Sequence, residues 1–216
     1  MQPPPAQHSR SRQKMSKADI TQSHIEPLLD YFHNVVPLTD NEKQLVAALF
    51  KPRLYRKRQY ILQEGDICHQ FNFIIRGCLR MYKVDDNGKI HILQFAPENW
   101  WLSDMCSFHK RKPSELNIDT LEDTMVFQIS YENSLSLYKN APKFYQIFKE
   151  LIEHSFLSLQ DRLLQYISST AEERYHSFLD TYPQLTNRLP QTQVASFLGI
   201  TPEFLSRLRN RQAKKA

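Results

Sequence analysis

The spacing of apolar residues changes twice along the chain, and each change predicts a different kind of element. Residues 25–35 carry apolar positions three and four apart, which is the spacing of one buried helix face. From Arg53 to about Ile129 the pattern changes to short segments rich in β-branched and aromatic residues, such as YILQEGD and KIHILQFA. After Pro142 the helical spacing returns. The chain is therefore expected to hold a run of strands between two helical regions.

Turn signals separate the expected strands. Gly65 and Gly77 fall between apolar runs, where a turn needs a positive φ, and Asp86, Asn87 and Gly88 together are typical of a β-hairpin. No helical pattern interrupts the strands, which favours antiparallel over parallel pairing. The predicted fold class is α+β, with an antiparallel β-roll (a jelly roll, or double-stranded β-helix) followed by helices.

A long helix is expected after Pro142, because apolar residues recur there about every 3.6 positions, and Ile147 and Leu151 widen the stripe. Packing against the β domain would cover this face, and so would the same helix of a second chain. We favour both, and therefore a homodimer. The residues assigned to the dimer interface are Phe148, Ile152, Phe156, Leu159, Leu163 and Tyr166.

Two capping boxes mark further helix starts. Thr39 with Glu42 predicts a helix through residue 50, and Thr170 with Glu173 predicts one that stops before Pro183. The expected organisation is a disordered extension at 1–17, a β-roll sensor domain with N-terminal helices at 18–141, a linker and dimerisation helix at 142–168, and a DNA-binding domain at 169–216.

Charge is concentrated at the C-terminus. The net charge is +5, and residues 188–216 carry six basic residues against one acidic residue, which alone gives +5. An excess of positive charge at one end is typical of a nucleic-acid-binding region, although a solvated basic tail is the simpler alternative. The basic residues are Arg188, Arg207, Arg209, Arg211, Lys214 and Lys215.

Several function classes find little support. Apolar runs are too short to span a membrane, and the first residues lack the apolar centre of a signal peptide. Three irregularly spaced cysteines suggest neither a disulfide framework nor a metal or iron–sulfur ligand set. We expect a cytoplasmic protein without a cofactor or bound metal.

The segment from Leu189 to Arg211 has the pattern of a helix-turn-helix. Gly199 lies where the tight turn needs a residue without a side chain, Thr201 is placed as an N-cap and Pro202 as a first-turn proline. An apolar seam is expected from Val194, Leu198, Ile200, Leu205 and Leu208. An ordinary helical hairpin is the alternative, but seam, cap and basic face together favour binding to double-stranded DNA.

The exposed face of the second helix carries side chains suited to reading base edges. Arg207 can donate two hydrogen bonds to guanine, and Glu203 can accept one from cytosine. The predicted DNA-binding residues are Gln191, Thr192, Thr201, Glu203, Ser206, Arg207, Asn210 and Arg211.

With EGD, RGCLRMY and LGITPEFLSRLR in this order, the chain resembles the Crp/Fnr family of bacterial transcription regulators from Leu38 to Arg211. The resemblance implies a homodimer on a palindromic operator, contact with RNA polymerase, and a small-molecule effector. It places Glu203 and Arg207 on the family's base-reading Glu and Arg. Pro202 replaces the preceding Arg, which puts the usual target sequence in doubt, and no β wing is expected after Arg211.

The resemblance also points to an altered effector pocket. Nucleotide-binding members carry Gly-Glu and, further on, Arg-Ser, whose Arg pairs with the phosphate. Here Ser103 and Asp104 fall at the first pair, and Ser114 and Glu115 at the second. Without the guanidinium, cyclic AMP is not expected to bind in the usual way. Arg111 or Lys112 could substitute from nearby.

The sequence favours a transcription regulator over an enzyme. A cupin-like metal enzyme would need inward-facing ligands, for which His69, His91 and His109 on separate segments give weak support. A nucleotide-sensing module without DNA activity is a third possibility, against which the basic C-terminus argues.

Overall fold

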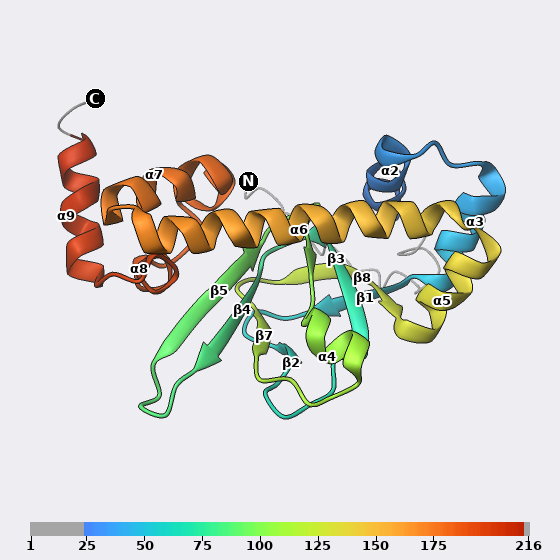
Figure 1. The fold of residues 1–216 in the computed structure, drawn as a ribbon, viewed down its shortest axis with the longest axis horizontal. Coiled ribbons are helices and arrows are strands. Elements are labelled where there is room, and N and C mark those ends of the chain that lie inside the picture. The colour runs from blue at the N-terminus through green and yellow to red at the C-terminus, as the bar shows by residue number, and fades with distance from the viewer. Residues whose placement is uncertain (1–23, 214–216) are drawn as a thin grey trace, which may run out of the picture.

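The structure is a computed structural model that describes residues 24–213. It places a β-roll beneath one long helix, with smaller helices at both ends of that helix (Figure 1). The predicted extension at 1–17 and the lysines at 214 and 215 lie outside the described residues. Within the described part, no helix is both long and apolar enough to cross a membrane.

Two antiparallel sheets form the roll, as the alternation of short apolar segments predicts. One sheet has the order β1-β8-β3-β6 and the other β2-β7-β4-β5. The predicted hairpin joins β4 to β5, where Asn87 and Lys89 donate their amides to the Asp85 carboxylate. The strands are β1 (Lys51–Tyr55), β2 (Tyr60–Leu62), β3 (Gln70–Arg76), β4 (Leu79–Val84), β5 (Ile90–Ala96), β6 (Trp101–Leu102), β7 (Asn117–Thr120) and β8 (Thr124–Ser130).

The predicted helices form with the predicted caps. Both capping boxes are present, since Thr39 and Thr170 each bond reciprocally with the glutamate three residues later. Two further helices, α4 and α5, were not expected from the sequence. The helices are α2 (Glu26–Val35), α3 (Asp40–Leu49), α4 (Met105–Lys110), α5 (Tyr131–Asn140), α6 (Lys143–Ser168), α7 (Ala171–Thr181), α8 (Gln191–Leu198) and α9 (Pro202–Ala213), with a 3-10 turn at Pro183–Leu185.

Two hydrophobic clusters hold the molecule together. The first joins the inside of the roll to α2, α3 and the N-terminal half of α6. The second joins β4 and β5 to α7, α8 and α9, and in it the Phe95 and Phe197 rings lie 5.3 Å apart. The helix-turn-helix is therefore packed directly on the roll.

Candidate nucleic-acid interface and sensor pocket

The turn between α8 and α9 has the predicted geometry. Gly199 adopts φ 68° and ψ 33°, the left-handed conformation that ends many helices. The Ile200 amide donates to the Ala195 carbonyl at 3.0 Å, which closes the turn. Thr201 accepts a hydrogen bond from the Phe204 amide at 3.2 Å, so α9 begins at Pro202 with a capped first turn.

The seam of the motif is buried and its polar face is exposed. Leu205 and Leu208 are buried within the second cluster, together with Val194 and Leu198 of α8. Every residue predicted to contact DNA is exposed, and all lie at the start of α8, just before α9 or on α9: Gln191, Thr192, Thr201, Glu203, Ser206, Arg207, Asn210 and Arg211. The fold thus presents the predicted set on one accessible unit.

Two further properties of the α9 face bear on DNA contact. Hydrogen bonds from its own backbone amide and from Thr201 lower the pKa of Glu203, and the charge of Arg207 lowers it further. Sequence reasoning missed Phe204, whose side chain is 37% exposed and lies 5.5 Å from the Arg207 guanidinium. An aromatic residue on a DNA-reading helix can contact a thymine methyl. The position of Phe204 beside Arg207 was the signal that could have identified it from the sequence.

Polar contacts fix α8 to the edge of the roll. The Ser196 hydroxyl donates to the Ile90 carbonyl at 2.6 Å, and Arg162 of α6 donates to the carbonyls of Ile92, at 3.0 Å, and Phe197, at 3.4 Å. Arg162 therefore connects β5, α6 and α8.

Arg188 forms a second attachment. Its guanidinium makes two 2.9 Å bonds to the Glu98 carboxylate and also binds Glu122. Burial would raise the pKa of Glu98, but the bonds from Arg188 and the Gly77 amide lower it. Arg188, counted in the basic C-terminal segment, is thus neutralised by the roll.

The apolar stripe of the long helix is buried in its N-terminal part and exposed further along. Phe148, predicted at the dimer interface, is buried in the first cluster with its ring 5.7 Å from Trp101, so that assignment was wrong. Tyr166, also assigned there, donates to the Phe197 carbonyl of its own chain at 3.3 Å. By contrast, every residue from 152 to 161 is exposed. Ile152, Phe156, Leu159 and Leu163 form the exposed stripe.

A groove of about 660 Å³ runs between the exposed stripe and the roll. Its walls are mainly apolar, with Met81, Leu93 and Met105 on the roll side. Residues 103–115, where the sequence predicts an altered effector pocket, are called the cassette below, and they contribute Ser103 and Asp104 to the groove wall.

The polar groups of that cassette are satisfied internally. The buried Asp104 carboxylate accepts from the Ser114 hydroxyl at 2.6 Å and from the amides of Cys106 and Ser107, which start α4. Ser103, also buried, donates to the carbonyls of Gln70 and Leu102. The segment is built as a capped short helix.

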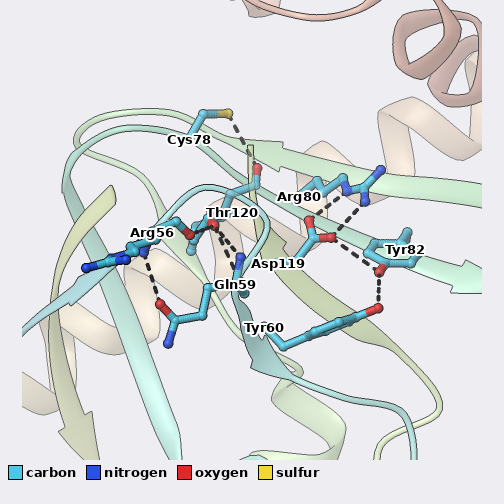
Figure 2. A network of polar contacts seen from close by, with 9 residues as sticks. Arg56, Gln59, Tyr60, Cys78, Arg80, Tyr82, Asp119 and Thr120 are labelled. Carbon is cyan, nitrogen blue, oxygen red and sulfur yellow. Dashed lines mark hydrogen bonds and ion pairs between the residues drawn. The ribbon is translucent and has the colours of Figure 1, made fainter. Parts of the chain in front are cut away.

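Another buried polar network lies on the roll beside the hairpin strands (Figure 2). Arg80 makes two 2.7 Å bonds to Asp119, and Tyr82 donates to the same carboxylate at 3.3 Å. The Arg80 and Asp119 side chains are 14% and 6% exposed, so the pair joins β4 to β7 as a structural contact.

Comparison with known proteins finds a matching family and a related regulatory protein. Residues 52–141 match the family described as Cyclic nucleotide-binding domain. The regulatory protein HlyX of Actinobacillus pleuropneumoniae is 24% identical over 199 residues, which are 83% of this chain and 80% of HlyX. The expected likeness to the Crp/Fnr family is confirmed.

Two solved structures share the fold of this chain. FixK2 from Bradyrhizobium japonicum is 18% identical, with a TM-score of 0.68 over 77% of this chain and 85% of its own. A transcriptional regulator of the crp/fnr family from Eubacterium rectale is 20% identical, with a TM-score of 0.64 over 86% and 88%.

Arg111, which the sequence offered as a substitute for the phosphate-pairing arginine, has other partners in the structure. Its guanidinium lies 3.3 Å from His69 and 3.6 Å from the Glu132 carboxylate, at the start of α5. Glu115 is exposed and pairs with Lys83 at 3.7 Å. Lys112 is also exposed, and its carbonyl accepts from Ser107.

The histidines considered for a metal site in the roll do not converge. His91 bonds to Asp85 at 2.8 Å, whereas His69 and His109 lie on other segments. Among residues 24–213, no three His, Cys, Asp or Glu side chains are grouped to hold a metal ion.

Proposed function

We propose that this protein is a sequence-specific, double-stranded-DNA-binding transcription regulator. The observation that carries the proposal is α9, which is capped, held by a buried seam, and exposes Glu203, Arg207 and Asn210 on one face. A helix presented in this way fits the major groove with its N-terminal half, where base edges differ most between sequences. In this proposal the protein acts in the cytoplasm and has no catalytic role.

We further propose that it acts as a homodimer on a palindromic operator. A helix segment exposed around its whole circumference, with Phe156 and Leu159 each 64% exposed, is better explained by a second copy than by solvent. Twofold symmetry would place two α9 helices about 34 Å apart, one turn of DNA. RNA polymerase is the partner expected of a regulator so placed.

For the sensor roll we propose a ligand other than a cyclic nucleotide bound in the usual mode. The cassette offers no unpaired arginine, and Asp104 is already satisfied. An effector of the groove would be recognised by apolar contacts along Met81, Leu93 and Leu159.

The experiment that tests DNA binding is selection of fragments from genomic DNA by the full chain. We expect enrichment of fragments that share an inverted repeat with half-sites about one helical turn apart. Arg53→Ala, which alters an exposed arginine on β1, should select the same repeat. Recovery of fragments without a shared sequence would contradict sequence-specific binding.

A further inference from the structure

A second cleft lies on the other side of α6, away from the exposed stripe. Its volume is about 460 Å³, and α6, α7 and the end of α8 line it. These helices come together at the C-terminal end of α6 (Figure 1). Polar groups, including Arg162, Arg174 and Ser177, account for much of its wall, unlike the apolar groove on the stripe side.

Two arginines line this cleft without a carboxylate partner. Neither Arg162 nor Arg174 makes an ion pair with any acidic residue in the described chain. Arg174 donates to the carbonyls of Leu198 and Ser169, at 3.2 and 2.7 Å, and Arg162 to those of Phe197 and Ile92. These bonds use part of the five N–H donors that each guanidinium offers.

The charge on Arg162 is poorly compensated. Burial lowers the pKa of Arg162, because its charged form loses solvation. The last carbonyls of α8 and the ring of Phe197, 3.9 Å from the guanidinium, supply partial negative charge. A bound anion would supply a full negative charge. Asp161 also lines the cleft, so a ligand with one acidic group fits better than a polyanion.

The rest of the wall indicates what the anion is attached to. Phe178, Tyr182 and Phe197 add aromatic surface beside the arginines, and the hydroxyls of Ser177 and Thr181 add hydrogen-bonding groups. A cleft of this volume is within the usual range for small-molecule sites.

We propose that this cleft binds a small organic acid, with one carboxylate or phosphate on the arginines and an apolar or aromatic body against Phe178 and Phe197. Such a ligand would contact α6, α7 and α8 together and would stabilise their packing. An effect on operator affinity rests on the proposed function, but binding of the acid does not.

The test is calorimetry on the full chain with benzoate, phenyl phosphate and the uncharged benzyl alcohol. We expect saturable binding of one of the two acids and none of the alcohol, and the acid that binds identifies the anionic group. Arg174→Gln should weaken that binding at least tenfold. Arg53→Gln, which removes an exposed arginine on β1, should leave it unchanged.

A second variant separates ligand binding from folding. Ser177→Leu fills the cleft from α7 and leaves the arginine bonds to α8 in place, so it should abolish binding in a folded protein. Absence of saturable binding by both acids would overturn the proposal. So would binding that survives both Arg174→Gln and Ser177→Leu but is lost in Arg207→Ala, because the anion would then occupy the α9 face.

Discussion

At the residue scale, the position of Arg207 on α9 defines its proposed role. It lies one helical turn after Glu203, so both side chains project from the same exposed face near the start of the helix. The Phe204 ring lies 5.5 Å from the Arg207 guanidinium. A positioned arginine can make the paired bonds to guanine that a mobile lysine cannot.

We predict that Arg207→Ala reduces operator affinity by about 1–3 kcal/mol and changes affinity for random DNA little. Removing Lys214 and Lys215, which lie outside the described residues, should weaken both kinds of DNA alike and flatten the salt dependence. Salt-titrated binding to operator and scrambled duplexes measures both effects. Equal losses on the two duplexes for Arg207→Ala would assign this arginine to phosphate contact.

Gly199 and Gly88 form a matched pair for testing the turn. Both have positive φ, 68° and 77°, but a Cβ at Gly199 would lie 2.7 Å from the Tyr166 hydroxyl, whereas one at Gly88 meets nothing within 4 Å. We predict that Gly88→Ala lowers the free energy of unfolding by about 1–2 kcal/mol through backbone strain, and that Gly199→Ala lowers it more. Urea denaturation measures both, and equal losses would mean that Tyr166 moves aside freely.

At the element scale, the connections between helices and strands decide how the helix-turn-helix is held. Ser196, Arg162 and Arg188 join α8 and its preceding segment to β5 and to the loops beside it. For the ion pair between Arg188 and Glu98, the pH dependence of its contribution to stability can be predicted.

Because the folded pKa of Glu98 lies below its ordinary value of 4.5, its ion pair stabilises the protein above that pH. The stabilisation is lost as the pH falls through the folded pKa. We predict that Arg188→Gln costs about 1 kcal/mol at pH 7, a value typical of partly exposed pairs, and less toward pH 3. Urea denaturation across this range, with Arg53→Gln as control, measures the difference. A pH-independent difference would contradict the assignment.

The contacts at the two ends of the short helix α4 argue against cyclic-nucleotide binding. Since Asp104 and Ser114 satisfy each other and Arg111 pairs with Glu132, cyclic AMP and cyclic GMP should not bind in the usual mode. Calorimetry of the full chain with each nucleotide is expected to give no saturable heat at micromolar concentration. If either nucleotide bound saturably, and charge reversal at Arg111 or Lys112 abolished that binding, the reversed residue would be the substitute contact to the phosphate.

At the scale of the whole molecule, two hydrophobic clusters leave α6 uncovered beyond its N-terminal part. The last α6 residue in the first cluster is Leu151, and the second cluster contains no α6 residue. A single chain therefore leaves a long apolar helix face in water, which costs free energy until another surface covers it.

We predict a dimer in solution that Phe156→Glu converts to a monomer. Leu157→Glu is the matched control, because these neighbours are 64% and 54% exposed but point about 100° apart around the helix. Light scattering at micromolar concentration measures the mass of each protein. A monomeric wild-type mass, or a dimer that both variants leave intact, would contradict the proposed interface.

The sequence alone determined the elements whose signals are local. Capping boxes, the left-handed glycine before Thr201 and the alternation within strands each act between residues a few positions apart, and all appear in the structure. The missed α5 starts with Ser130 as its N-cap directly after a strand, which hides its start in an apolar run.

The tertiary structure decided what lies between the elements. Ser196 and Ile90 are 106 positions apart, and no local pattern indicates that they are in contact. The same holds for the split of the α6 stripe, because Phe148 and Ile152 differ in burial through what packs on them and not through their residue type. The cleft between Arg162 and Arg174 arises for the same reason. Local sequence fixes dihedral preferences and caps, whereas burial and pairing follow from surfaces that meet after the chain has folded.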